Sequence, residues 1–237
     1  METSIDAPAA LPLATAPATL DRVRARGRGE SGIRSSSASH RPELEYLKAV
    51  NSVAPPRDPQ LLFLLMAEYS NANLQGEGAE FFSARLKEFE PGLPDAEKAL
   101  YLSAIGLLRA QHASSVPLLH RVGYVKKTIA ILEQSKQLSG RTIFVVNWIA
   151  GIVRAQLPGW FHQRERAEAE LGWCLENADK APHAGWLREI YYHLGKLAVA
   201  EGEQTKAQDY LRNCDGTRAP AAGSIARDKD LSRCSPK

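Results

Sequence analysis

Six histidines and three cysteines are the residues that could bind a metal, and their spacing indicates no metal site. The chain has no H-E-x-x-H, H-x-H-x-D-H or C-x-x-C pattern, the arrangements that bring zinc ligands together. His112 and His120 lie on opposite sides of an expected turn, but no third ligand stands near them in the sequence. We therefore expect neither a metal nor any other cofactor.

Nucleophilic and acid–base catalysis are not expected either. Cys174 shares an apolar helix face with Leu171 and Ala178, which is typical of a buried structural thiol. Glutamates within residues 165–170 lie among arginines, a pattern that favours a solvent-exposed face with salt bridges. The G-x-S-x-G and P-loop motifs, and a G-x-G-x-x-G that follows a strand, are absent as well. We expect that the chain is not an enzyme.

The composition is that of a water-soluble globular protein. Apolar residues make up 44% and charged residues 24% of the 237 residues, and the formal net charge is +3. The positive surplus lies in the two ends, so the body (40–215) is near neutral and nucleic-acid binding is not expected. No apolar stretch reaches the roughly 20 residues that span a bilayer. The odd, widely spaced cysteines form no disulfide framework, and we expect a cytoplasmic protein without membrane contact.

Both ends of the chain differ in composition from its body. Residues 1–41 are rich in Ala, Pro, Ser, Gly and Arg, and residues 216–237 have a similar character. Such segments bury too little apolar surface to offset the entropy lost on ordering. We expect a disordered leader (1–41), a helical-repeat domain (42–215) and a disordered tail (216–237).

The body predicts helices throughout, because turn signals arrive at helix-length intervals and no run alternates as a strand would. One expected helix, between Pro117 and Gly140, has an apolar stripe with alternating steps of four and three residues, formed by Leu118, Val122, Val125, Ile129 and Leu132. Eight of the nine expected helices form consecutive antiparallel pairs. Besides the helix between Pro117 and Gly140, helices are expected at residues 43–51, 59–73, 79–89, 96–110, 142–156, 161–178, 184–200 and 203–213.

A short sequence recurs in these helices with a spacing of 45 residues. Gly106-Leu-Leu-Arg-Ala-Gln111 matches Gly151-Ile-Val-Arg-Ala-Gln156, and a weaker copy, Gly195-Lys-Leu-Ala-Val-Ala200, follows after 44 residues. Each copy lies in the first helix of an expected pair. Glycine costs roughly 1 kcal/mol in a helix interior, so we expect these glycines to let the second helix of each pair approach closely.

The last pair has a distinctive order of large and small residues. Tyr191-Tyr-His-Leu194-Gly195, the turn residue Gly202, the small Ala207 and the bulky Leu211 follow one another at fixed spacing. This order resembles a tetratricopeptide repeat, although Ala198 stands where that family usually has Tyr. The resemblance covers residues 55–215 with one good unit and divergent others, and the period exceeds the family's value of about 34. It implies an all-α fold, a right-handed α-solenoid of stacked antiparallel helix pairs.

The resemblance also implies that the first helices line a concave face that binds a protein or peptide partner. Arg109 and Arg154 hold equivalent positions in the repeated sequence, and their side chains could bind an extended peptide or its carboxylate. Arginine near a helix end also suits the helix dipole without a ligand. Core packing is the favoured role of each tryptophan: Trp148, Trp160, Trp173 and Trp186. The candidate partner-binding residues are Arg109, Gln111, Asn147, Trp148, Arg154, Gln156, Tyr192 and Lys196.

The leading interpretation is therefore a protein-interaction scaffold, and two alternatives remain open. The stretch Ala181-Pro-His-Ala-Gly-Trp186 is loosely similar to the helical part of bacterial metallo-β-lactamase-fold proteins. That similarity implies a helical accessory domain of a larger hydrolase, of which this chain would be a truncated part. The second alternative is a peptide-sensing regulator. The pattern predicts no oligomeric state and does not identify the partner.

Overall fold

The computed structural model of the protein describes residues 44–45, 47–48, 59–181 and 184–215. Within these ranges every element is helical, so the predicted all-α class is confirmed. The expected leader (1–41) and tail (216–237) lie outside the described residues. The α-helices are α3 (Pro59–Asn71), α4 (Gln75–Phe89), α5 (Asp95–His112), α6 (Leu118–Leu138), α7 (Phe144–Ala155), α8 (Arg164–Glu176), α9 (Ala184–Glu201) and α10 (Gln204–Asp215).

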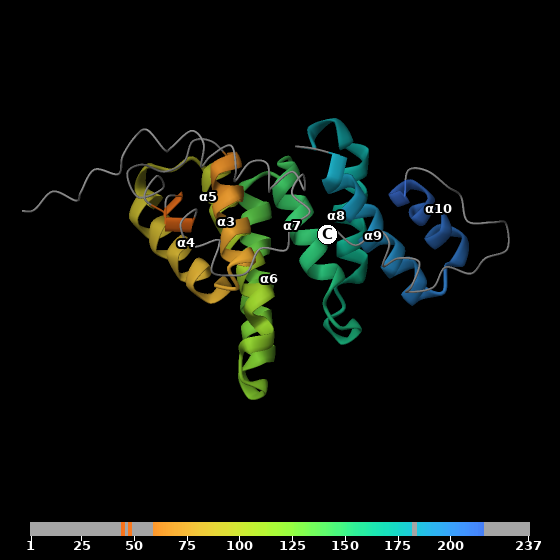
Figure 1. The fold of residues 1–237 in the computed structure, drawn as a ribbon, viewed down its shortest axis with the longest axis horizontal. Helices are drawn as coiled ribbons and strands as arrows, with labels where there is room; N and C mark the ends of the chain where they lie inside the picture. Colours follow the sequence, from red (N-terminus) through yellow and green to blue (C-terminus); the bar gives the residue numbers. More distant parts are fainter. Residues whose placement is uncertain (1–43, 46, 49–58, 182–183, 216–237) are drawn as a thin grey trace, which may run out of the picture.

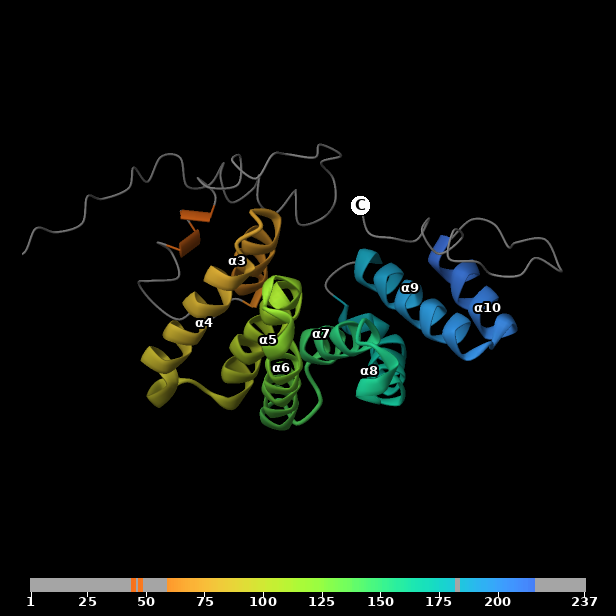
Figure 2. The ribbon, with the colours of Figure 1, turned by 90° about the horizontal axis from the view of Figure 1, so that it is seen from below.

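Successive helices lie along the longest axis of the molecule, from α3 and α4 at one end to α10 at the other (Figure 1 and Figure 2). α5 packs against α6, α7 against α8, and α9 against α10. α5 also contacts α3 and α7, and α7 contacts α9. The first helices of neighbouring pairs therefore touch one another.

The glycines of the repeated sequence explain how closely two of these pairs pack. A Cβ atom on Gly106 of α5 would overlap the Leu132 side chain of α6. A Cβ atom on Gly151 of α7 would lie 2.7 Å from the Leu171 side chain of α8. The predicted role of these two glycines, close approach of the second helix, is confirmed.

The turn between α3 and α4 lies earlier than expected. The sequence predicts a helix over residues 79–89, because Gly76 and Gly78 before it are typical of a turn, but α4 begins at Gln75 and contains both glycines. The turn uses Asn73 instead, whose backbone is left-handed (φ 60°). This prediction was wrong because a glycine needed for packing looks like a turn glycine in the sequence: a Cβ on Gly78 would lie 2.7 Å from the Tyr69 ring.

The ends of α6, α8 and α9 show how local backbone conformation sets helix boundaries. Gly140 (φ 57°) follows α6, and Gly202 (φ 79°) joins α9 to α10, as the sequence predicts. α8 begins at Arg164 and not at the expected residue 161, because residues 159–161 form a 3₁₀ turn, η5 (Gly159–Phe161), and His162 is left-handed.

An aromatic cluster joins three pairs at the centre of the core. The Trp148 ring of α7 stacks on the Trp186 ring of α9, with centroids 4.0 Å apart, and the Phe63 ring of α3 lies 4.7 Å from Trp186. Such ring pairs contribute about 0.5–1.5 kcal/mol beyond the area they bury. Packing is thus confirmed for Trp148 and Trp186, but the same expectation was wrong for Trp160, which is 57% exposed.

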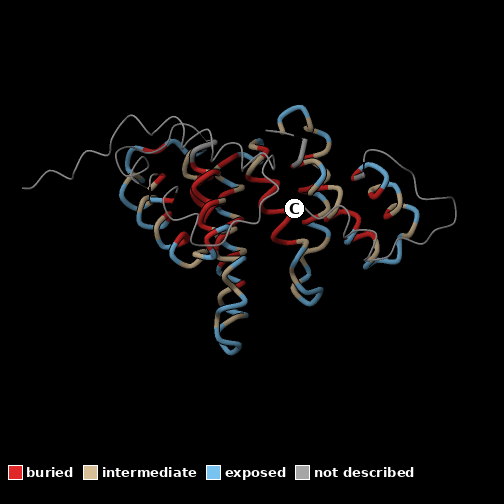
Figure 3. The backbone as a smooth tube through the Cα atoms, in the orientation of Figure 1, coloured by how far each residue is buried: buried red, intermediate tan, exposed pale blue. Residues whose placement is uncertain are grey.

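The N-terminal end of α6 projects beyond the rest of the helices (Figure 1), and Figure 3 shows this end largely exposed. Val125 and Leu132 of the apolar stripe are buried, whereas Leu118 is 76% and Val122 is 42% exposed. The reason is length, since α6 has 21 residues and α7 only 12. The stripe therefore extends past its neighbours.

None of the described helices combines the length and the apolar character needed to cross a membrane.

Candidate functional site

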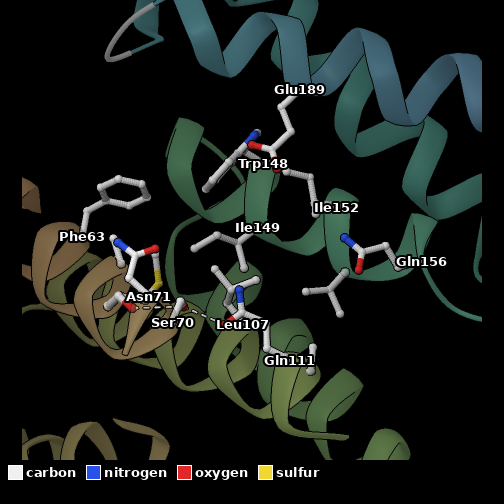
Figure 4. Close-up of a pocket in the computed structure, with 14 residues that line it drawn as sticks. Phe63, Ser70, Asn71, Leu107, Gln111, Trp148, Ile149, Ile152, Gln156 and Glu189 are labelled. Atoms are coloured by element: carbon white, nitrogen blue, oxygen red, sulfur yellow. Dashed lines mark hydrogen bonds between the residues drawn. The ribbon is translucent and has the colours of Figure 1, made fainter. Parts of the chain in front are cut away.

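Four helices line one groove with a cavity volume of about 240 Å³. They are α3, α5, α7 and α9, the first helices of the pairs (Figure 4). We call this cavity the first-helix groove. Its walls include Phe63, Met66, Leu107, Trp148, Ile149 and Ile152, and its polar groups belong to Ser70, Asn71, Gln111, Gln156 and Glu189.

Trp148, which lines the groove, carries a buried hydrogen-bond donor without a partner among the described residues. The residue is only 6% exposed, and its ring is held by stacking on Trp186. The indole Nε1–H is buried and has no acceptor among the described residues. A buried donor without a partner costs about 1–3 kcal/mol, so an acceptor supplied by a ligand would stabilise this site.

Glu189 of α9 places a carboxyl group at the edge of the groove, above Trp148 in Figure 4. Burial raises the pKa of this carboxyl group from 4.5 to about 7. No ion pair involves Glu189 within the described residues, so nothing there compensates for the lost hydration of its charge. A bound cation or hydrogen-bond donor would do so.

Two glutamine amides lie away from Glu189, where α5 and α7 end (Figure 4). The Ser70 hydroxyl donates to Gln111 Oε1 at 2.7 Å and thereby joins α3 to α5. Gln156 follows α7 directly and is exposed. Both amides can donate to and accept from a peptide backbone.

Arg109 and Arg154, the arginines of the repeated sequence, do not line the groove. The Arg109 guanidinium lies 4.0 Å from the centre of the Tyr124 ring, and its Nε donates to Thr128 Oγ1 at 3.3 Å. Arg154 is 1% exposed and forms an ion pair with Glu133 at 2.6 Å. Both arginines therefore connect a first helix to α6.

The Arg154 ion pair belongs to a larger charge network between α6, α7 and α8. Arg154 and Lys136 both pair with Glu170, which is 3% exposed. Burial, reinforced by the charge of Arg154, lowers the pKa of Lys136 to about 8. The expectation that glutamates 165–170 all face solvent was wrong at Glu170. The alternation of charge along α8 does not reveal that Lys136 of α6 and Arg154 of α7 lie close enough to pair with Glu170.

Three further candidates also lie outside the groove. Asn147 is buried, and its Nδ2 donates to the carbonyl oxygens of Arg141 and Ile143, both at 3.0 Å, which stabilises the start of α7. The Lys196 ammonium lies 5.7 Å from the centre of the Tyr192 ring on α9. The structure thus brings together only Gln111, Trp148 and Gln156 of the candidate set.

Phe63 and Glu189 line the groove but were missed by the sequence analysis. Phe63 lies outside the repeated sequence and has no distinguishing pattern. Glu189 had a usable signal, because Trp186 and His193, three residues before it and four after it, are both buried on the same helix. An acid between two buried neighbours marks a carboxyl group withdrawn from water.

Cys174 and a cluster of three glutamates outside the groove have structural roles that need no ligand. Cys174 is buried, and burial raises the pKa of its thiol to about 12, as expected of a structural cysteine. Carboxylates of Glu168, Glu201 and Glu203 lie close together, but the Lys206 ammonium already pairs with Glu168 at 3.2 Å and Glu203 at 2.9 Å.

Comparison of the chain with models of protein families, with curated proteins and with solved structures finds no match, so the groove itself is the ground for any functional conclusion.

Proposed function

We propose that the protein is an interaction scaffold that binds a peptide segment of a partner protein in the first-helix groove. The unpaired indole N–H of Trp148 carries this proposal. Buried donors without an acceptor are rare in native proteins, and a main-chain carbonyl of a bound peptide would supply the acceptor. The groove combines apolar side chains, such as Phe63 and Ile149, with the polar groups described above.

The proposal includes the finer description of the fold, a right-handed tetratricopeptide-like solenoid. Three observations support it: contacts between first helices of successive pairs, glycine-mediated packing within two pairs, and the resemblance of the last pair to a tetratricopeptide unit. In such a stack the first helices form one continuous surface. The first-helix groove lies on that surface.

The lining of the groove favours a particular kind of peptide. Phe63, Ile149 and Ile152 suit an apolar side chain. The Glu189 carboxylate suits a lysine, an arginine or an N-terminal amine, since an ion pair compensates for the hydration that the charge loses on burial. The amides of Gln111 and Gln156 suit the peptide backbone.

Selection of peptides from a displayed random library against the full chain, followed by affinity measurement, tests this function. The selected peptides should contain a basic residue and an apolar residue. Glu189→Gln should weaken their binding about tenfold, which corresponds to about 1.4 kcal/mol. Gln156→Ala should weaken it less, because Gln156 is exposed.

Glu201→Gln provides the matched control, since Glu201 lies on the same helix but outside the groove. It should leave the affinity unchanged. Selected peptides that bind equally well to the wild type, Glu189→Gln and Gln156→Ala would place binding elsewhere and refute the proposal.

A further inference from the structure

A second surface lies at the projecting end of α6. Among the described residues, the exposed large apolar side chains are those of Leu118, Leu119, Val122 and Trp160. All four lie at this end of α6 or at the neighbouring turn η5. Apolar side chains that gather at one place mark an interaction surface more strongly than scattered ones do.

A cleft of about 540 Å³ opens between these residues. Leu118, Val122 and Ile129 of α6 form one wall, and Leu157 and Trp160 form the facing wall beyond α7. We call it the α6 cleft. The end of α6 and the turn that contains η5 point to the same side of the molecule (Figure 1).

The α6 wall has the side-chain spacing with which helices interlock. Leu118, Val122, Val125, Ile129 and Leu132 alternate steps of four and three residues. Leu132 is fully buried against Gly106 of α5, but α5 ends at His112 and the stripe continues past it. The open part of the stripe therefore offers a place for one more helix.

Charge indicates which kind of helix fits. Residues 98–164 contain nine lysines and arginines and a single acid, Glu133. Residues 40–97 contain five basic and ten acidic residues, and residues 165–215 contain six basic and ten acidic residues. The near-neutral body thus consists of a basic middle between two acidic ends.

One basic group lines the cleft and a second lies beside it. Lys126 of α6 is exposed and lies one helical turn after Val122. Arg121 lines the cleft, and its guanidinium is held by donation to the carbonyl oxygens of Ser114 at 2.9 Å and Val116 at 3.1 Å. Two α6 clefts from two copies of the chain would repel each other, whereas an acidic partner is attracted.

We propose that the α6 cleft is a docking site for an amphipathic helix of a partner protein, with an apolar stripe and acidic flanks. The apolar stripe enters between Val122 and Trp160, and the acidic flanks face Arg121 and Lys126. This site is independent of the first-helix groove in its chemistry, since the groove offers the Glu189 carboxyl group and the cleft offers the Arg121 guanidinium.

A synthetic helical peptide tests the proposal on the full chain. The probe has about three heptads with leucines at alternating steps of three and four and glutamates on both flanks. Its twin has lysines in place of the glutamates. The glutamate peptide should bind at least about tenfold more tightly than the twin and should lose affinity as salt rises. Its binding should shift the emission of Trp160, and Trp160→Phe should abolish this shift.

Variants at the cleft separate docking from a change in folding. Val122→Gln should weaken binding about tenfold, with an unchanged melting temperature because the side chain is 42% exposed. The double variant Arg121→Glu with Lys126→Glu should reverse the preference between the two peptides. Glu189→Gln, in the first-helix groove, should leave both affinities unchanged.

Several results would overturn the proposal. Absence of binding, equal binding of both peptides, or no reversal by the double variant would each do so. Vesicles of phosphatidylserine and phosphatidylcholine that bind the chain through Val122 in preference to the peptide would indicate a membrane surface instead. Self-association that Val122→Gln abolishes would indicate a second copy of the chain.

Discussion

Burial moves the pKa values of two neighbouring groups on α9 in opposite directions. It raises the pKa of Glu189 to about 7, and it lowers the pKa of His193 to about 4 with help from the charge of Lys196. Both residues therefore favour their neutral forms in the folded protein. Glu189 contributes stability that is full below pH 4.5 and is lost as the pH rises through 7. His193 contributes stability that is full above pH 6.5 and is lost as the pH falls towards 4.

The variant Glu189→Gln should separate the two contributions. Relative to the wild type, its free energy of unfolding should rise between pH 4.5 and pH 8 by about 2 kcal/mol, because the cost of a buried carboxylate disappears. As the pH falls from 6.5 towards 4, the free energy of unfolding should decrease more steeply in the variant than in the wild type, because the opposing contribution of Glu189 is absent. Urea denaturation at several pH values measures both effects. A constant difference between the two proteins across this range would contradict the partial burial of the Glu189 carboxyl group.

Arg154 is the second residue whose substitution is informative. Arg154→Met should destabilise the protein by about 3 kcal/mol, because Glu170 stays buried and loses one of its two cationic partners. Arg166→Met should cost less than about 1 kcal/mol, since Arg166 pairs with Glu133 from a side chain that is 60% exposed. Urea denaturation of both variants tests the contrast. Equal losses of stability would mean that the network is not buried in solution.

At the scale of the helix, substitution of a glycine at a close helix contact can be compared with substitution of an exposed glycine as its control. Gly106→Ala should destabilise the protein by about 1–3 kcal/mol, because its Cβ overlaps Leu132. Gly123→Ala in α6 should stabilise it by about 0.5–1 kcal/mol, because a Cβ there meets nothing within 4 Å and alanine favours helix. Thermal unfolding measures the two shifts. Shifts of the same sign would contradict the close approach of α5 and α6.

Helix positions could be predicted from the sequence wherever local rules act alone. Gly140 and Gly202 end their helices because their backbones are left-handed, and such positions have a direct sequence signal. Gly78 could not be assigned in this way, because its role depends on Tyr69 of another helix. The exposed half of the α6 stripe was missed for a similar reason, since the shorter length of α7 decides its burial.

The candidate site was predicted in part, and the difference again depends on which helix a side chain faces. Gln111, Trp148 and Gln156 line the groove as expected of first helices. Arg109 and Arg154 occur on the same helices but turn towards the second helices, where Tyr124 and Glu133 hold them. A repeated sequence shows that two residues share an environment, but it does not show whether that environment is a ligand or a neighbouring helix.

At the scale of the whole molecule, charge divides the chain into unlike parts. The first-helix groove presents Glu189, and the α6 cleft lies in the basic middle of the chain. The two cavities share Val153 and Gln156 and are therefore neighbours. A scaffold of this design would bring two partners of opposite charge to adjacent positions on one row of helices.

The indole N–H signal of Trp148 tests the central claim most directly. In a ¹H–¹⁵N correlation spectrum of the full chain, a peptide selected from the library should shift the Trp148 signal downfield, because the indole gains its missing acceptor. The signal of Trp173, which lines neither cavity, should not move. If a bound peptide leaves the Trp148 signal in place while the signals of other tryptophans shift, the first-helix groove is not the binding site.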